Sequence, residues 1–260
     1  DGGRGRMQMY IFTNTPVNRD GDFDGDVVFH EHTHGLSHRL IGNGSGLGTN
    51  RSGGMGEGWS DFVGGSLLSE PTDPINGIYT VGAYDTFQVA AFGITTNNGY
   101  YGIRRLPYAP IGFRGGPQNR PFNPLTAGDV NTGCVINDGA FPPVRGGACN
   151  QVHNTGEIWA SMLHGVRAQS IRRLGQAAGN QKMLQFVVDG MKGSPLGPNF
   201  QQERDALIAA ALASSAAPEA AVDVADVWTG FALRGMGNGA TDNGTTVVES
   251  FVVPGALTID

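Results

Sequence analysis

The stretch Val27-Val28-Phe29-His30-Glu31-His32-Thr33-His34 decides how this chain of 260 residues is interpreted. It places an HExxH motif on an apolar run. Residues four apart lie one turn above each other on one face of a helix, so His30 and His34 can direct two imidazoles at one metal ion. Glu31 would stand beside that ion as a general base. The stretch therefore predicts one helix of a catalytic zinc site.

A second stretch, Gly54-Met55-Gly56-Glu57-Gly58-Trp59-Ser60-Asp61, supplies what the first one lacks. A catalytic zinc ion takes three protein ligands and keeps one position open for water. Glu57 begins an apolar helical stretch and is the expected third ligand. Asp61, one turn further on, is expected to accept a hydrogen bond from a ligating histidine and to fix its tautomer. Together the two stretches predict a zinc-dependent hydrolase.

Other interpretations of these residues stay open. HExxH also arises by chance, so the stretch could be a surface helix with incidental histidines. The presence of Glu57 makes this interpretation weaker. His34 and His38 are four residues apart too, but no Glu follows His34, so we expect His32 and His38 to be exposed residues without a role. A catalytically inactive zinc-binding module is a further alternative, although a structural zinc site has no use for a base at Glu31.

Composition narrows the class of protein. A net charge of −6, with 15% charged residues and no basic cluster, argues against a nucleic-acid partner. No apolar run approaches the roughly 18 residues that a membrane-spanning helix needs, so no membrane partner is expected. Cys134 and Cys149 bracket a loop rich in Gly and Pro, and we expect them to form a disulfide in a secreted, extracellular protein. Two free buried thiols are the alternative.

Hydrophobic periodicity predicts where the helices and strands lie. Helices are expected over residues 26–40, 56–68, about 154–166 (capped by Asn154 or Thr155), 183–191, 201–213 and 227–233. A glycine-rich loop is expected over 42–54, and residues 76–147 show little periodicity. The β-prone segments are Met7–Phe12, which is apolar enough for an interior strand, and Thr245–Val253.

The acidic run from Asp20 to Asp26 resembles the first half of an EF-hand calcium loop. The twelfth position of such a loop supplies a bidentate Glu, and here that position is Glu31. Because Glu31 is assigned to catalysis, we predict a polar turn that leads into the first helix. Calcium binding is kept only as an alternative.

Beyond these motifs, the chain resembles the catalytic domain of fungalysin, a family of secreted zinc endopeptidases in the thermolysin-like gluzincin group. The resemblance extends over most of residues 4–239. The segments that carry it are Arg6–Tyr10, His30–Ser37, Gly53–Phe62, Tyr101–Arg105, Asn123–Thr126 and His153–Leu163. It implies an α+β fold: part of a small N-terminal β region (1–25), a mainly helical zinc-binding lobe (26–240), and a tail or the start of a following module (241–260).

The resemblance also assigns roles to individual residues. Those already proposed from the motifs keep their roles: His30, His34 and Glu57 on zinc, Glu31 as base, and Asp61 behind His30. His153 resembles the histidine that hydrogen-bonds the oxyanion, although by itself it is equally typical of a helix cap. Arg104 resembles the arginine that holds the substrate carbonyl on the leaving side, and Arg105 competes with it for this role.

Two departures from the thermolysin-like pattern affect these expectations. Leu68 stands at an acidic position that partners Asp26 in a double calcium site, so that site is not expected here. The second oxyanion donor is a Tyr that would fall within residues 42–54, where this chain has none. His153 is therefore expected to act with a different helper or alone.

The resemblance implies polypeptide substrates and an N-terminal inhibitory propeptide in the precursor. A gluzincin aminopeptidase is the alternative enzyme, but it would need an acidic anchor for a substrate amine, which we do not find in the sequence. In the family pattern Asp1 falls inside the catalytic domain. We therefore expect a substrate-pairing edge strand upstream of Asp1, and weak peptide cleavage by these 260 residues alone.

Overall fold

The computed structural model describes residues 5–13, 17–87, 98–116, 119–131 and 149–255. Helices are the main regular elements of these ranges: α1 (Gly25–Leu40), α2 (Asn50–Leu68), α3 (Asn98–Tyr101), α4 (Val152–Leu174), α5 (Gln176–Gly193), α6 (Phe200–Ala213) and α7 (Glu219–Ala232). The strands form two antiparallel pairs, β1 (Ile11–Phe12) with β2 (Arg19–Asp20) and β3 (Thr241–Asp242) with β4 (Val247–Val248). The predicted α+β class with a mainly helical lobe is confirmed.

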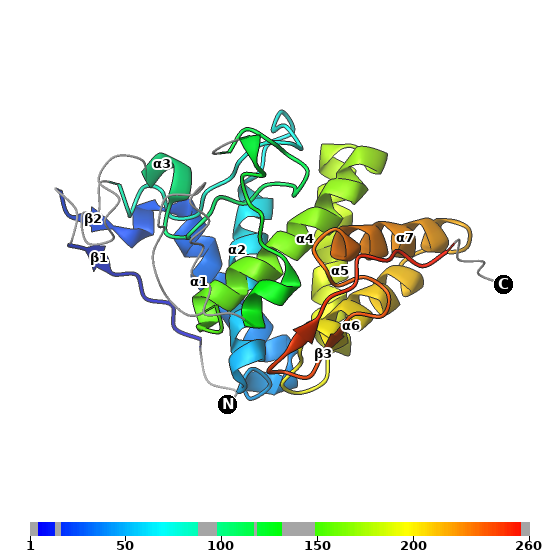
Figure 1. Cartoon of the computed structure of the whole chain (residues 1–260). Helices are drawn as coiled ribbons and strands as arrows, with labels where there is room; N and C mark the ends of the chain where they lie inside the picture. Colours follow the sequence, from blue (N-terminus) through cyan, green and yellow to red (C-terminus); the bar gives the residue numbers. More distant parts are fainter. Residues whose placement is uncertain (1–4, 14–16, 88–97, 117–118, 132–148, 256–260) are drawn as a thin grey trace.

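The helices pack around a central pair, α2 and α4 (Figure 1). On one side α1 packs against α2, and the β1–β2 ribbon lies at the edge of the molecule beyond α1. On the other side α5 and α7 pack against α4, and α6 contacts both of them. Within the described ranges, no helix has both the length and the apolar character needed to cross a membrane.

The start of α1 is set by acidic caps. Asp24 is its N-cap, and Asp24 Oδ1 accepts a hydrogen bond from Asp26 N at 3.1 Å. The preceding 3₁₀ turn, Gly21–Phe23, is capped in the same way by Asp20. Side-chain oxygens satisfy the free N–H groups of a helix start, and the negative charge suits the helix dipole. The predicted polar turn is confirmed, and Glu31 lies inside α1 rather than at the end of a calcium loop.

The start of α2 was predicted too late. The helix begins at Asn50, within the stretch predicted as a loop, because Thr49 and Ser52 form a capping box. Ser52 N donates to Thr49 Oγ1 at 3.0 Å, and Thr49 N donates to Ser52 Oγ at 3.1 Å. The glycines that follow made this stretch resemble a loop, because each weakens a helix by about 1 kcal/mol relative to Ala.

Tertiary packing explains the glycines of α2. A Cβ atom at Gly58 would lie 2.5 Å from the carbonyl oxygen of Gly156, and one at Gly54 would lie 2.5 Å from Thr155 Cβ. The absence of side chains therefore allows α2 and α4 to approach closely beside Glu57. The close contact compensates for the low helix propensity of glycine.

We expect Gly58→Ala to lower the free energy of unfolding by about 1–3 kcal/mol, since its methyl group would overlap α4. Gly65→Ala is a matched control in the same helix, because a Cβ there has no neighbour within 4 Å. The control should leave stability unchanged or raise it by up to about 1 kcal/mol. Urea unfolding of both variants tests this, and equal midpoints would contradict the role given to Gly58.

The later helices are longer than predicted. α4 begins at Val152, and its N-cap is Gln151 rather than Asn154 or Thr155. α5 and α7 extend beyond the predicted 183–191 and 227–233 because their additional turns consist largely of small and polar residues, which give little hydrophobic periodicity. α6 agrees with its prediction to within one residue.

The β-prone segments form less sheet than predicted. In Met7–Phe12 only the last two residues pair, with β2 as their only strand partner among the described residues. Tyr10 is 72% exposed and Ile11 58%, so the interior strand was a wrong prediction for this chain. Thr245–Val253 contributes only Val247–Val248 to the β3–β4 hairpin.

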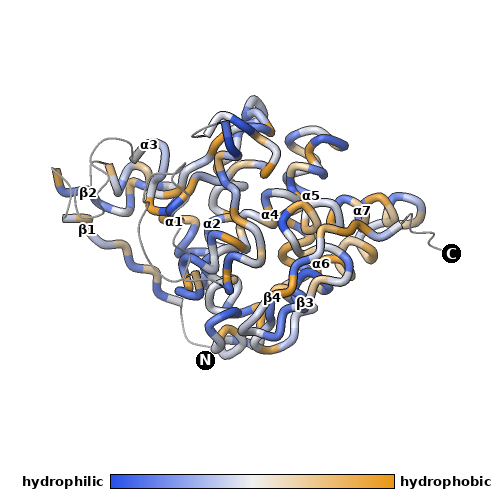
Figure 2. Tube along the Cα trace, viewed as in Figure 1, coloured by the Kyte–Doolittle hydropathy of each residue, from blue (hydrophilic) through white to orange (hydrophobic). Residues whose placement is uncertain are grey.

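The hydrophobic core is centred on Trp159 of α4, which is fully buried. Its ring meets Trp59 of α2 edge to face at 5.9 Å, stacks on Phe200 of α6 at 5.5 Å, and packs on Phe231 of α7 at 5.6 Å. Hydrophobic positions gather where these helices meet (Figure 2). Each aromatic pair adds about 0.5–1.5 kcal/mol beyond its buried area, which holds α2 firmly in place.

Two predictions from the sequence are not tested by this structure. Cys134 lies outside the described residues, so the Cys134–Cys149 disulfide stays a prediction. The domain boundaries at residues 25 and 240 also stay predictions. After the second boundary, Asp242 of β3 forms an ion pair with Arg51 of α2, and Asp242 Oδ2 accepts from Phe200 N at 3.0 Å.

Candidate metal centre

Helices α1 and α2 bring three ligand-type side chains together. His30 and His34 lie one turn apart on α1, and their Nε2 atoms are 3.1 Å from each other. Glu57 of α2 faces both rings: Oε2 lies 3.2 Å from His30 Nε2, and Oε1 lies 3.6 Å from His34 Nε2. Among the described residues, this is the only group of three such side chains whose ligand atoms all lie within 4.8 Å of one another.

The spacing of these atoms fits a metal ion. Ligands at about 2.0–2.1 Å from a tetrahedral zinc ion lie about 3.3 Å apart, close to the separations found here. Glu57 Oε2 is buried and forms no hydrogen bond within the described structure. Two imidazole nitrogens and a carboxylate oxygen are ligands that zinc prefers. The three residues can therefore hold such an ion without rearrangement of the helices.

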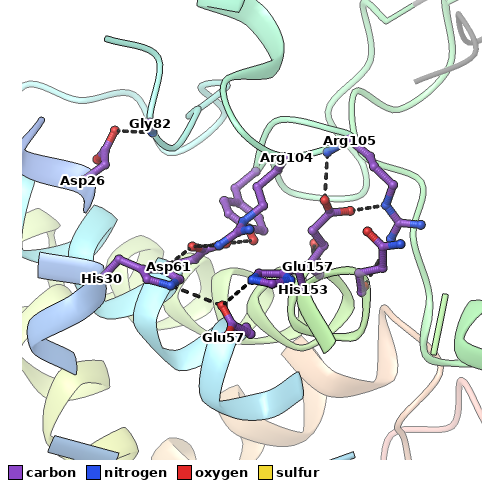
Figure 3. Close-up of polar contacts among 12 residues, drawn as sticks. Asp26, His30, Glu57, Asp61, Gly82, Arg104, Arg105, His153 and Glu157 are labelled. Carbon is purple, nitrogen blue, oxygen red and sulfur yellow. Dashed lines mark hydrogen bonds and ion pairs between the residues drawn. The ribbon is translucent and has the colours of Figure 1, made fainter. Parts of the chain in front are cut away.

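Asp61 fixes the ring of His30 from behind. Asp61 Oδ1 lies 2.8 Å from His30 Nδ1, so Nδ1 donates to the carboxylate and Nε2 faces Glu57 (Figure 3). Asp61 also accepts from Arg104 Nε at 2.6 Å, from Arg104 Nη2 at 2.7 Å and from Tyr108 Oη at 2.5 Å. Four hydrogen bonds therefore hold one buried carboxylate in a single orientation.

The charges of this group compensate one another. Burial alone would raise the pKa of Asp61, but Arg104 and the hydrogen bond from His30 hold that pKa far below its usual range. Burial alone would lower the pKa of His30, but its contacts with Asp61 and Glu57 raise it to about 9. Burial also opposes the charge of Glu57, yet its histidine neighbours keep its pKa below the usual range.

Glu31 lies on the open side of the group. Its side chain is exposed, and together with His34 it lines a cavity of about 780 Å³. The cavity is also lined by Arg6 and Met7 from the segment that precedes β1. The predicted base is therefore accessible from solvent, directly beside one of the predicted ligands.

His153 reaches the same group from the N-terminus of α4. Its Nε2 lies 3.5 Å from Glu57 Oε2, and its ring is about half exposed. Gln151 Oε1 accepts from His153 N and Asn154 N, so the Gln151 amide nitrogen faces His153 Nδ1 at 2.8 Å. Because that amide donates, Nδ1 is the acceptor and Nε2 carries the proton. His153 thus presents an N–H group toward the metal ligands.

Arg104 and Arg105 are neighbours in sequence but bind different helices (Figure 3). Arg104 binds Asp61 of α2, and its Nη1 has no hydrogen-bond partner among the described residues. Arg105 Nε donates to Glu157 of α4 at 2.6 Å, and Arg105 Nη2 donates to Asn154 O at 3.1 Å. Arg104 is therefore the arginine beside the metal ligands, and Arg105 joins this loop to α4.

The sequence analysis missed two residues of this site. Tyr108 binds Asp61 from an irregular segment without periodicity, and Gln151 orients His153 from a capping position assigned to other residues. The expected exposure of His32 and His38 is confirmed, and neither belongs to the metal-binding group. A Gln two residues before a helical histidine was the local signal that could have revealed Gln151.

Comparison with known proteins agrees with this geometry. The family model for fungalysin metallopeptidases (M36) matches residues 1–240. The chain belongs to the fungalysin family. This confirms the resemblance inferred from the HExxH and Glu57 segments.

The fungalysin relatives are secreted proteins by name. The chain is 34% identical to an extracellular metalloproteinase of Aspergillus fumigatus, over 99% of this chain and 37% of the relative. It is 34% identical to an extracellular metalloproteinase of Aspergillus niger, over 92% of this chain and 34% of the relative. It is 33% identical to extracellular metalloproteinase 10 of Coccidioides posadasii, over 98% of this chain and 37% of the relative. The chain thus spans about a third of the length of these fungalysins.

Proposed function

We propose that this fungalysin chain carries the zinc centre of a secreted endopeptidase that hydrolyses peptide bonds, with Glu31 as general base. The observation that carries the proposal is the convergence of His30, His34 and Glu57 at 3.1–3.6 Å, with Glu31 on the accessible side. Family membership and the names of the relatives, extracellular metalloproteinases, support the same assignment.

Zinc held by these three residues would lower the pKa of a water molecule toward about 7 and polarise the scissile carbonyl. Glu31 would accept a proton from a water molecule activated in this way and deliver it to the leaving amine. General-base catalysis of this kind contributes about 10²–10⁴-fold to the rate. Asp61 keeps His30 Nδ1 protonated, so its Nε2 lone pair stays available to the metal.

Two side chains position the substrate in this mechanism. His153 Nε2–H donates to the oxygen that becomes negatively charged at the scissile carbonyl, and Gln151 holds it in the required tautomer. Arg104 Nη1 donates to the next carbonyl on the leaving side, while its other nitrogens stay fixed on Asp61.

An extended polypeptide is the substrate class that we propose. The cavity beside Glu31 is wide and open, and within the described ranges no acidic anchor for a substrate amine lines it other than Glu31 itself. This favours an endopeptidase over an aminopeptidase. An N-terminal inhibitory propeptide in the precursor is part of the same proposal, and an inactive zinc-binding module is the alternative to be tested.

Mapping the cleavage sites of an unfolded protein tests this function. We expect internal cleavage at many sites, loss of more than 99% of activity with a zinc chelator, and recovery when about one equivalent of zinc is restored. Trimming from the substrate N-terminus would instead indicate an aminopeptidase. Zinc binding without any cleavage, by this chain and by a longer version that includes upstream residues, would indicate an inactive module.

A further inference from the structure

A second carboxylate cluster lies at the start of α1, apart from the proposed zinc ligands. The turn that leads into the helix carries Asp20, Asp22 and Asp24, and the buried side chain of Asp85 comes from a distant segment. Asp85 is 0% exposed, and neither of its carboxylate oxygens has a hydrogen-bond partner within the described structure. A buried carboxylate without partners is unfavourable, so its conformation requires an explanation.

The Asp85 segment is fastened to the acidic turn. Gly82 N donates to Asp26 Oδ2 at 3.2 Å (Figure 3), and Asp85 N donates to Asp24 Oδ2 at 3.1 Å. A Cβ atom at Gly21 would lie 3.4 Å from Asp85 Oδ2 and 3.2 Å from the carbonyl oxygen of Tyr10. One oxygen of the Asp85 carboxylate and the Tyr10 carbonyl oxygen therefore both lie close to the space that a side chain at Gly21 would occupy.

The charges around Asp85 favour a cation. Burial raises the pKa of Asp85 to about 6, and the negative charges of Asp24 and Asp20 add to this effect. The positive charge of Arg19 acts against this effect, but Arg19 stacks on Tyr84 and Phe87 at 4.5 and 5.0 Å from their ring centroids. It forms no ion pair with Asp85 among the described residues. The repulsion among these carboxylates would be relieved by a bound cation.

We propose that Asp85, together with Asp24 and the Tyr10 carbonyl, binds a calcium ion. Calcium prefers carboxylate and carbonyl oxygens and accepts variable geometry with water completing its shell. This site differs from an EF-hand loop, because its central ligand comes from a segment far along the chain and Glu31 takes no part. The proposed calcium site does not depend on the catalytic function proposed above for the chain.

The composition of the site predicts weak binding. These carboxylates do not form a compact group of three within 4.8 Å, so water molecules must supply several ligands. Calcium sites of this kind in extracellular modules have dissociation constants of about 10⁻⁴–10⁻³ M. Because Asp24 is the N-cap of α1, a bound ion would hold the helix that carries His30 and His34.

Calcium titration of the zinc-loaded 260-residue chain tests the proposal. With about 10 mM calcium chloride, Tm should rise by roughly 3–10 °C, as expected for binding in this affinity range. Terbium should bind at the same site and give luminescence through Tyr84, the neighbour of Asp85, and excess calcium should displace it. Asp85→Asn should abolish both effects, since it removes the charge and keeps the shape.

Asp22→Asn is the matched control, because Asp22 lies in the same turn with an exposed side chain. It should retain the calcium-dependent rise in Tm and the terbium signal. If Asp85→Asn does not fold, Asp20→Asn replaces it and should weaken calcium binding several-fold. A wild-type Tm unchanged by calcium, or an equal rise in Asp85→Asn, would overturn the proposal and leave a buried water molecule or a protonated Asp85 as the explanation.

Discussion

Glu31→Gln should lower kcat by about 10²–10⁴-fold while the chain still binds one zinc ion. The three proposed ligands, His30, His34 and Glu57, remain in place, and only the group that accepts and delivers the proton is lost. Gln has nearly the same shape and volume, so the cavity beside α1 is preserved. The effect should therefore appear in kcat rather than in zinc content or stability.

Single-turnover cleavage of one peptide, together with zinc analysis of the purified variant, measures this effect. Glu70→Gln is the control, since it makes the same chemical change at an exposed position after the end of α2. A Glu31→Gln variant that keeps more than about a hundredth of the wild-type kcat would show that another group acts as the base. Loss of the zinc ion would show instead that Glu31 supports the ligands.

Asp61→Ala should lower the free energy of unfolding by about 3–5 kcal/mol, because it leaves the buried Arg104 guanidinium without its partner. It should also weaken zinc binding by about 10–100-fold, since His30 loses the hydrogen bond that fixes its tautomer. Tyr108 would lose the acceptor of its hydroxyl group as well. Among single substitutions in the described structure, this one breaks the largest number of hydrogen bonds at the site.

Urea unfolding of the metal-free chain and zinc competition with a chelator measure the two effects separately. For Asp61→Asn, both the free energy of unfolding and the affinity for zinc should lie between those of the wild type and Asp61→Ala, because the amide oxygen still accepts one hydrogen bond. Asp189→Asn is the control for the loss of a negative charge, since Asp189 lies at the surface, where it contacts Lys192 in an exposed ion pair and accepts a hydrogen bond from Gln185. Asp189→Asn should lower the free energy of unfolding by only about 0–1 kcal/mol. Equal costs for Asp61→Ala and Asp189→Asn would contradict the structural role of Asp61.

The sequence determined those features of the site that depend on local periodicity. His30 and His34 are four residues apart, so any helix through them places both imidazoles on one face. Glu57 and Asp61 have the same spacing, which predicted that one residue faces the metal and the other stands behind the ring of a ligating histidine, which is His30 in the structure. These predictions needed only the geometry of a helix and the ligand preferences of zinc.

Only the tertiary structure decided which residues from irregular segments complete the site. Arg104 and Arg105 are equivalent in sequence, and their roles separate only because Asp61 and Glu157 lie on different helices. Tyr108 likewise contacts Asp61 from a segment without periodicity. No local pattern encodes such contacts, because they depend on where distant elements meet.

The glycines of α2 and the side chain of Asp85 illustrate the same limit. In the sequence, Gly54 falls at the end of the predicted loop and Gly58 weakens the predicted helix, but in the folded chain both allow α4 to approach Glu57 within a continuous helix. Asp85 has no motif around it, and its buried carboxylate is distinctive only beside Asp24. Helical spacing is a property of neighbouring residues, whereas close approach and burial are properties of the complete fold.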